Sequence, residues 1–353
     1  MMQYFLEGRY KTLDLHHVRM AFSEDITEVG KAGPGKVGHL IALIVRIIKA
    51  RFRTGARILY YPPASPNLAP FLRDCAVLIC TRWLFQKTVF HFHANGISEF
   101  RRSLPGILQW LYRRAYGRPE LSICLSKLAV EDAKDFNSLR TAIVPNGIPD
   151  HPDAGFSKHM DVSCPVILYL GTVSEEKGVG VLLDALGVLA KKKQPFRCII
   201  AGPFASASEE TVLRQRCAAL ELDTSISWRG AVSGNAKWAC YLEADVFCFP
   251  SYYKTEGLPI VLIEAMMFSL PIVATSWRAI PEIVLQDKNG FLTPTHDPQA
   301  VATQLLKLLR NSILVQDMGN SARNRFATLF TVEEFRCGME EALSGLEENP
   351  VQS

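Results

Sequence analysis

The sequence predicts an α/β protein built on two doubly wound parallel sheets. Its 353 residues suffice for about two domains of ordinary size. From residue 164 onward, short apolar runs alternate with longer segments of helical periodicity, which is typical of a parallel sheet with crossover helices. The first half of the chain repeats this alternation less regularly.

The second half supplies the clearest elements. The run Val246-Phe247-Cys248-Phe249 is apolar at every position, as expected of a strand that is buried on both faces. Such sheets bind their ligands at the carboxyl ends of the strands, so the loops that follow the strands are the candidate site. We expect strands at 165–171, 196–202, 226–228, 246–249 and 272–274, and helices at 181–189, 208–221, 235–242 and 261–268.

The first half is expected to hold a similar sheet, with two basic amphipathic helices beside it. The segment after residue 150 is polar and has no periodic pattern, which predicts a linker. Thr331 and Glu334, three residues apart, form a capping box that predicts a last helix. The expected strands are 57–61, 88–93, 121–125 and 141–144, and the basic helices are 40–53 and 100–114. The expected divisions are an N-terminal domain over 1–150, a linker over 151–164, a C-terminal domain over 165–330 and a final helix within 331–353, free to pack back toward the N-terminal domain.

Composition excludes several classes of protein. With 48% hydrophobic and 21% charged residues, the chain is neither disordered nor a small disulfide-stapled scaffold. Its nine cysteines include no CxxC pair and lie mostly in apolar runs, which predicts buried free thiols in a reducing compartment. The start carries no signal-peptide pattern, and no run of about eighteen apolar residues occurs. We therefore expect a cytoplasmic protein.

Charge is distributed unevenly along the chain. Residues 1–150 contain 21 Lys and Arg against 12 Asp and Glu, a net charge of +9, whereas residues 151–353 contain 18 against 23, a net charge of −5. The basic helices of the first half are either packing helices with a solvated edge or a contact surface for an anionic membrane. The same charge would suit nucleic acid, but no aromatic-basic recognition module is present, so no nucleic-acid partner is expected.

Two loops of the second half carry candidate binding residues. The segment from Gly171 to Gly178 joins an expected strand to a helix, and it offers a glycine for close backbone approach and Lys177 as a point charge for a phosphate. Farther on, Glu256 lies in a loop and Glu264 lies eight residues later inside an apolar helix. A carboxylate on so apolar a helix needs a partner. That partner is either a pair of ribose hydroxyls or a Lys or Arg side chain.

The pattern of residues resembles one family of enzymes. Glu256 and Glu264 form an EX7E motif, and the second half is similar to the retaining GT-B glycosyltransferases of family 4, also called glycosyl transferases group 1. Further matches are Glu176-Lys177-Gly178, Gly202, Arg229-Gly230-Ala231-Val232, Pro250-Ser251, Ile280-Pro281-Glu282-Ile283-Val284, Asn289-Gly290-Phe291-Leu292 and, in the first half, His91-Phe92-His93, Ser122 to Ser126 and Val144 to Ile148.

The resemblance implies a GT-B fold, in which two Rossmann-like domains face each other across a cleft. The C-terminal domain would hold a nucleotide sugar, a UDP- or GDP-sugar, and the N-terminal domain would hold the acceptor. No metal and no cofactor are implied. The implied catalytic residues are Glu256, His93 and Lys177, and the implied donor-binding residues are Gly171, Thr172, Lys177, Gly202, Val232, Gly257, Leu258, Pro259, Ile260 and Glu264.

One histidine of the first half is expected to contact the transferred sugar. His91 and His93 share one face of a strand, because side chains alternate along a strand. His93 is the candidate of choice, since it lies nearer the loop.

The chain departs from the family pattern in two places. Thr172 stands where relatives commonly carry an arginine, so the diphosphate loses a cation unless Arg278 or another residue replaces it. The chain also contains no Gly-Gly pair, whereas relatives open with a strand and a glycine-rich loop. The N-terminal domain would then lack that first strand and loop, or build the loop differently.

The expected function is transfer of a hexose-type sugar, with retention of anomeric configuration, to a glycan or lipid-linked acceptor in polysaccharide or glycolipid biosynthesis. The protein would act in the cytoplasm, with peripheral contact at the inner membrane face through its basic half. Because of the two departures, an alternative is a nucleotide-sugar-binding partner of another enzyme with weak or no turnover. A relative that epimerises or hydrolyses the nucleotide sugar is a third reading.

Overall fold

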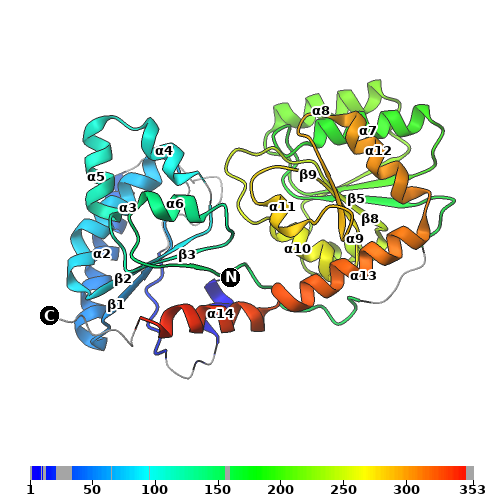
Figure 1. Ribbon diagram of the computed structural model, residues 1–353. Coiled ribbons are helices and arrows are strands. Elements are labelled where there is room, and N and C mark those ends of the chain that lie inside the picture. Colours follow the sequence, from blue (N-terminus) through cyan, green and yellow to red (C-terminus); the bar gives the residue numbers. More distant parts are fainter. Residues whose placement is uncertain are drawn as a thin grey trace. The chain divides into compact units, whose positions relative to one another are not determined.

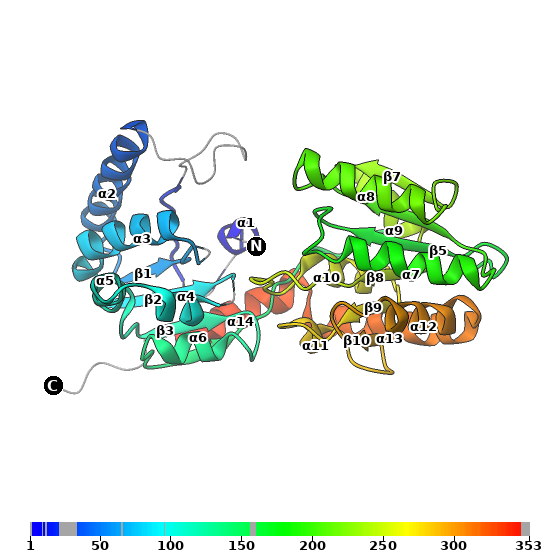
Figure 2. The same cartoon turned by 90° about the horizontal axis from the view of Figure 1, so that it is seen from above.

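The computed structural model describes residues 2–8, 10, 13–20, 34–64, 66–94, 96–155 and 160–346. The chain forms two compact units (Figures 1 and 2). The first unit comprises Met1–Pro145 together with Phe335–Ser353, and the second comprises Asn146–Glu334. The segment expected as a linker, 151–164, therefore belongs to the second unit.

The second unit contains a six-stranded parallel sheet with the strand order β10-β9-β8-β5-β6-β7. Its central strands are buried at every position, which explains why their sequences are apolar throughout rather than alternating. The strands are β5 (Val166–Leu170), β6 (Arg197–Ala201), β7 (Ile226–Gly230), β8 (Val246–Phe249), β9 (Ile272–Thr275) and β10 (Gly290–Thr293).

Helices cover both faces of this sheet. Figure 1 shows α7, α8 and α12 above the sheet and α10 and α13 below it. Helix α7 contacts both α8 and α12, and α10 contacts α13. The helices are α7 (Val179–Lys191), α8 (Ala207–Ala219), α9 (Gly234–Glu243), α10 (Ile260–Met267), α11 (Ile280–Ile283), α12 (Pro298–Leu309) and α13 (Ser312–Leu329).

The strand order reverses at β5. This strand pairs in parallel with β6 on one side and with β8 on the other. The loops that follow β5 and β8 therefore leave the sheet at the same edge, where the crossover helices diverge to opposite faces. Such a switch point creates a crevice at the carboxyl ends of the strands.

The first unit contains a four-stranded parallel sheet with the order β1-β2-β3-β4. One face packs on most of the helices of the unit, and the other face packs on α1 and on α14 from the end of the chain. The strands are β1 (Ile58–Tyr61), β2 (Lys87–Phe92), β3 (Leu121–Cys124) and β4 (Thr141–Ile143). The helices are α1 (Met2–Leu6), α2 (Pro34–Thr54), α3 (Leu68–Thr81), the 3-10 helix η2 (Arg82–Leu84), α4 (Ile97–Ser103), α5 (Gly106–Tyr116), α6 (Val130–Asp135) and α14 (Val332–Ser344).

Helix α14 fastens the end of the chain to the first unit. The Thr331 hydroxyl accepts a hydrogen bond of 3.2 Å from the backbone N–H of Glu334, which confirms the expected start of this helix. Phe335 and Met339 then pack with Val89 and Ile123 of the sheet. The chain thus leaves the first unit after β4 and returns to it through α14.

The expected helix over 100–114 is wrong, because two helices, α4 and α5, occupy this segment. The break lies at Leu104-Pro105. Proline has no N–H to donate and disfavours a helical conformation in the residue before it, and Leu104 is extended, with φ −77° and ψ 147°.

All nine cysteines are free, as expected, but Cys80 and Cys337 are exposed rather than buried. Throughout the described part of the chain, every helix is too short or too polar to cross a bilayer.

We expect Met339→Ala to lower the free energy of unfolding of the first unit by about 2–5 kcal/mol, because the fully buried side chain would leave a cavity between α14 and the sheet. Urea unfolding followed by circular dichroism measures this change. Cys337→Ala is the matched control, since Cys337 is exposed on the same helix. Equal stability of the two variants would contradict the packing described for α14.

Candidate functional site

Two loops of the second unit meet through an ion pair at the switch point. Lys177, in the loop after β5, places its Nζ 2.8 Å from Oε2 of Glu256, in the loop after β8. Both side chains are largely shielded from water, at 19% and 8% exposed. A charge so buried is costly unless it is paired, so each of these residues holds the other in place.

Neighbouring side chains complete the surroundings of the pair. The Ser251 hydroxyl donates a hydrogen bond of 2.7 Å to the same Oε2 of Glu256. The Lys177 ammonium lies 4.5 Å from the centre of the Tyr253 ring and 5.8 Å from that of Phe249, within the range of cation–π attraction. The site thus joins a carboxylate and an ammonium whose positions are fixed before any ligand arrives.

Backbone contacts tie three loops into one frame. The Tyr252 N–H donates to the carbonyl of Glu176 at 3.0 Å, which links the loops after β8 and β5. Trp277, after β9, donates its indole N–H to the Tyr253 carbonyl at 2.8 Å. The Thr275 hydroxyl donates to the Ser251 carbonyl. These bonds restrict the movement of the loops that carry Lys177 and Glu256.

Two glycines allow the loops to approach so closely. Gly178 has a φ of +79°, and a Cβ there would lie 2.0 Å from the Pro250 carbonyl oxygen. Gly202, after β6, has a φ of +141°, and a Cβ there would lie 1.8 Å from the carbonyl oxygen of Gly171. Any other residue at either position would push the loops apart.

Glu264 lies on α10, and each of its carboxylate oxygens has one partner in this structure. Lys237 Nζ is 2.6 Å from its Oε1, and the Tyr241 hydroxyl donates to its Oε2 at 2.8 Å. Burial and the neighbouring Glu264 carboxylate raise the pKa of Tyr241 well above its usual value, so the hydroxyl remains a donor. The structure therefore contains the Lys pairing that the sequence left as one alternative. Each carboxylate oxygen has a further lone pair, so its ribose contact stays a prediction.

The other candidate residues of the second unit lie at the same edge of the sheet. Thr172 is exposed, and its carbonyl accepts a hydrogen bond of 2.7 Å from the Tyr169 hydroxyl. Arg278, the candidate replacement for a missing cation, lies in the loop after β9. Gly171 and Thr172 follow β5, Gly202 follows β6, Val232 lies between β7 and α9, Gly257, Leu258 and Pro259 precede α10, and Ile260 begins it.

His93 lies in the first unit, directly after β2. Its ring centre is 4.2 Å from that of His91, whose Nδ1 is 2.5 Å from the Tyr60 hydroxyl. Burial lowers the pKa of His93 to about 4 and that of His91 well below its usual value. Both imidazoles are therefore neutral at pH 7. His91 is fully buried in the strand, whereas His93 stands where the loop begins.

Sequence reasoning missed Lys237, Tyr241 and Tyr253 as parts of this site. Lys237 and Tyr241 are four residues apart on the expected helix over 235–242, so they share a helix face, and this spacing is the signal that could have found them. Tyr253 carries no such signal, because its place over Lys177 depends on the fold of the loop. Within the described ranges, no three His, Cys, Asp or Glu side chains gather closely enough to hold a metal ion.

Comparison with known proteins identifies the part of the chain that carries this site. Residues 156–325 match the family model described as "Glycosyl transferases group 1". This segment, just under half of the chain, is similar to glycosyl transferases group 1 domains. It contains Lys177, Lys237, Glu256 and Glu264.

Curated relatives of the group 1 domain extend the match into the first unit. The amylovoran biosynthesis glycosyltransferase AmsK of Erwinia amylovora is 27% identical over 313 residues, which are 86% of this chain and 73% of that protein. The phosphatidyl-myo-inositol mannosyltransferase of Mycobacterium leprae is 30% identical over 63% of this chain. Four relatives at 30–33% identity, the mannosyltransferase among them, are matched over only 43–65% of their own length, less than two thirds.

Solved structures confirm the fold prediction. Sucrose-phosphate synthase from Thermosynechococcus elongatus superposes with a TM-score of 0.72 at 17% identity and covers 94% of this chain and 83% of that one. Anabaena Alr3699/HepE in complex with UDP gives 0.69 at 18% identity, over 88% and 84% of the two chains. The protein has the GT-B fold, with two Rossmann-like units around the parallel sheets described above.

We expect the stability of the first unit to fall as the pH falls from about 6.5 to about 4, since in this window an unfolded histidine binds a proton that folded His93 does not. The effect reaches about 3 kcal/mol. His93→Asn should reduce this loss, and urea unfolding at the two ends of the window measures it. His17→Asn, at an exposed position, is the control. A His93→Asn variant with the full wild-type loss would show that His93 is not buried in its neutral form.

Proposed function

We propose that this protein transfers a sugar from a nucleotide-sugar donor to a glycan or lipid-linked acceptor with retention of anomeric configuration. The observation that carries the proposal is the buried Lys177–Glu256 pair at the switch point of a group 1 domain. It joins a phosphate-binding cation to a carboxylate within one rigid frame, and a reaction that separates a sugar from a diphosphate needs both.

The donor diphosphate would bind between Lys177 and the beginning of α10. Lys177 offers an ammonium from the loop after β5. The backbone N–H groups of Gly257, Leu258 and Ile260 lie at the start of an eight-residue helix, where such groups attract anions, whereas Pro259 has no N–H to offer. Arg278 at the same edge supplies the cation that Thr172 does not. On binding, Lys177 exchanges part of its contact with Glu256 for the phosphate.

The nucleoside would lie beside α10. Glu264 would accept hydrogen bonds from the vicinal ribose hydroxyls through the lone pairs that Lys237 and Tyr241 leave open. A UDP- or GDP-sugar is the proposed donor, and Alr3699/HepE, which shares the fold, was crystallised with UDP. We propose that neither a metal ion nor a cofactor takes part.

The reaction breaks the bond between the anomeric carbon and the phosphate oxygen. The bonding electrons leave with the diphosphate, whose charge Lys177 and the α10 amides stabilise; this electrostatic stabilisation of the leaving group is the main contribution of the protein. The acceptor oxygen attacks from the same face, and its proton passes to the departing phosphate. Glu256 orients the sugar and stabilises the positive charge that develops at the anomeric carbon.

His93 would contact a hydroxyl of the transferred sugar. Because burial keeps the imidazole neutral, one ring nitrogen donates and the other accepts, which suits a sugar hydroxyl better than a phosphate. We propose His93 rather than His91 for this role, since the fully buried His91 already contacts Tyr60.

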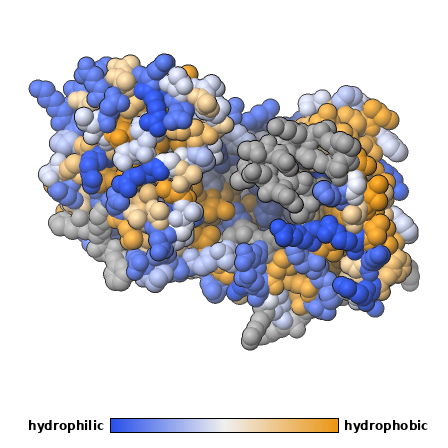
Figure 3. Space-filling model, turned by 180° about the vertical axis from the view of Figure 1, so that it is seen from behind, coloured by the Kyte–Doolittle hydropathy of each residue, from blue (hydrophilic) through white to orange (hydrophobic). Residues whose placement is uncertain are grey.

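The acceptor is proposed to be a precursor of a cell-surface polysaccharide or a glycolipid at the cytoplasmic membrane face. The names of two relatives, an amylovoran biosynthesis glycosyltransferase and a phosphatidyl-myo-inositol mannosyltransferase, support this class. Figure 3, a view from behind, has hydrophobic and hydrophilic residues interleaved over the first unit, at the right of that view. Exposed Val37, Ile41 and Phe52 of α2 alternate with exposed Arg46 and Arg53, as on peripheral membrane helices.

We expect Glu256→Gln to lower kcat at least about a hundredfold with little change in nucleotide affinity, because the carboxylate acts on charge that develops during the reaction. Release of nucleoside diphosphate from a panel of UDP- and GDP-sugars, with a membrane lipid extract as acceptor, measures the rate. Glu243→Gln makes the same charge change at a partly exposed position of α9 and is the control. A normal rate in the Glu256 variant removes Glu256 from the mechanism.

We expect Glu264→Gln to abolish discrimination between a ribonucleotide and its 2′-deoxy form. A hydrogen bond to a charged group contributes about 1.5 kcal/mol or more, so the wild type should prefer the ribonucleotide about tenfold. Isothermal titration calorimetry with UDP or GDP and the deoxy analogue measures both affinities. If the variant still prefers the ribonucleotide over its 2′-deoxy form, Glu264 does not bind the ribose and serves only to pair with Lys237.

A further inference from the structure

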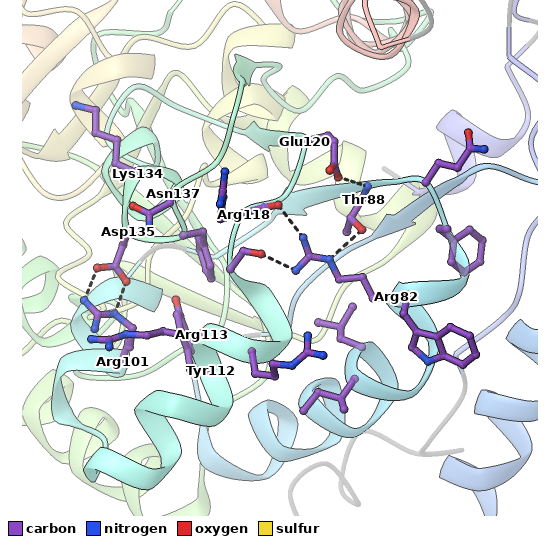
Figure 4. Close-up of a pocket in the computed structure, with 18 residues that line it drawn as sticks. Arg82, Thr88, Arg101, Tyr112, Arg113, Arg118, Glu120, Lys134, Asp135 and Asn137 are labelled. Carbon is purple, nitrogen blue, oxygen red and sulfur yellow. Dashed lines mark hydrogen bonds and ion pairs between the residues drawn. The ribbon is translucent and has the colours of Figure 1, made fainter. Parts of the chain in front are cut away.

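The first unit contains a hollow at the end of its sheet opposite to His93. It has a volume of about 870 Å³, within the usual range of ligand pockets. Its walls come from η2, the carboxyl end of α5, α6 and the segments that lead into β2 and β3 (Figure 4). We call it the arginine hollow, after the side chains that line it: Arg82, Arg101, Arg113, Arg114 and Arg118, with Lys134.

Two of these arginines are fixed in the wall. Arg101 forms two hydrogen bonds of 2.5 Å with the carboxylate of Asp135. Arg82 donates to the carbonyls of Ala115, Gly117 and Arg118 and to the Thr88 hydroxyl. The remaining acidic residue of the lining, Glu120, accepts a bond of 2.6 Å from the backbone N–H of Thr88. Of the two carboxylates in the lining, Asp135 is thus paired with Arg101, and Glu120 accepts from the backbone.

Three guanidinium groups remain. In the described part of the chain, the side chains of Arg113, Arg114 and Arg118 have no hydrogen-bond or ion-pair partner. Arg118 also has a φ of +53°, which is unfavourable for a residue with a side chain. Its N–H donates to the Phe136 carbonyl at 2.7 Å and its carbonyl accepts from Arg82 at 2.9 Å, so the strained backbone is held while the side chain is left without a partner.

The second observation is a buried hydroxyl in the wall of the hollow. Tyr112 lines the hollow, its side chain is 1% exposed, and its hydroxyl has no hydrogen-bond partner among the described residues. Leaving a buried hydroxyl without a partner costs about 1–3 kcal/mol. A phosphate oxygen in the hollow would accept this hydrogen bond and at the same time face the unpaired guanidinium groups, which suit phosphate geometry.

Large apolar side chains are exposed in the lining of the hollow and farther along α5. Trp83, which also lines it, is 74% exposed, and Ile107 and Trp110 on α5 are 73% and 60% exposed. Ile107, Trp110 and Arg114 follow one another at helical spacing, so α5 presents one stripe that passes from apolar to cationic. Exposed tryptophan beside cations is typical of protein surfaces that rest on lipid headgroups.

We propose that the arginine hollow binds the phosphate of an anionic phospholipid, with Trp83 and Trp110 inserted beside the headgroup. The inference rests on the membrane contact proposed above and names the surface and the chemistry of that contact. The combination of unpaired guanidinium groups, an orphaned hydroxyl and an aromatic rim fits a lipid phosphate better than a freely soluble one, which would need no rim.

The test is co-sedimentation of the full chain with vesicles of phosphatidylcholine, with and without about one third phosphatidylglycerol. The double variant Arg113→Glu with Arg114→Glu should bind anionic vesicles about thirtyfold more weakly, because each arginine near an anionic surface contributes about a factor of five. Lys191→Glu with Lys192→Glu makes the same charge change at exposed positions of the second unit and should bind as the wild type does. Equal weakening in both double variants overturns the hollow as the site.

Tyr112→Phe separates binding in the hollow from attraction to the surface as a whole. It leaves the charge unchanged and removes only the orphaned hydroxyl, so we expect severalfold weaker vesicle binding at equal or higher thermal stability. Unchanged binding would contradict a phosphate in the hollow. Soluble glycerol phosphate supplies the other arm: if it binds the hollow while vesicles do not, the ligand is a soluble phosphate and the lipid proposal fails.

The outcomes also separate this inference from the functions on which it rests. If Arg46→Glu with Arg53→Glu on α2 abolishes vesicle binding and the hollow variants do not, the membrane contact stands and the hollow is not its site. If the wild type binds no anionic vesicle, the membrane contact and the hollow both fail. Nucleotide binding to the second unit is measured by calorimetry without any lipid, so the proposed donor site is decided independently of either result.

Discussion

The requirement that two buried charges stay paired governs the second unit. Lys177 and Glu256 come from loops 79 positions apart in the chain, and they meet only because β5 and β8 are neighbours in the sheet. Gly178 brings the first loop against the second, and the Ser251 hydroxyl holds the carboxylate from the other side. The pair thus holds the loops after β5 and β8 together, and it also supplies the two charged groups of the proposed catalytic site.

The same device recurs one helix away, where Lys237 balances Glu264. Glu256 and Glu264 therefore each have their own lysine, so neither of them presents an unpaired negative charge to a diphosphate. An arriving anion competes for ammonium groups that are already in position. The arginine hollow of the first unit is built on the opposite plan, since its outer guanidinium groups have no carboxylate partner among the described residues.

Much of the fold could be predicted from sequence, because a strand that is buried on both faces is apolar at every position. The central strands β5 and β8 are unbroken apolar runs of this kind. The prediction of one helix over 100–114 was wrong, because Pro105 interrupts the helix even though the amphipathic pattern continues past it. For the site, spacing and motif could indicate Lys177, Glu256 and Glu264, but not that lysines neutralise both carboxylates. Such pairings depend on which strands are neighbours, and sequence periodicity does not encode that order.

The most direct test of the central claim is calorimetric titration of the chain with UDP, GDP, ADP and CDP, and with the matching nucleosides. The account predicts that UDP or GDP binds to the wild-type protein. Lys177→Met should lower the affinity for that nucleoside diphosphate about tenfold or more, and it should leave the affinity for the matching nucleoside unchanged. Absence of binding by every nucleotide, or a Lys177→Met variant that binds the diphosphate as tightly as the wild type, would contradict it.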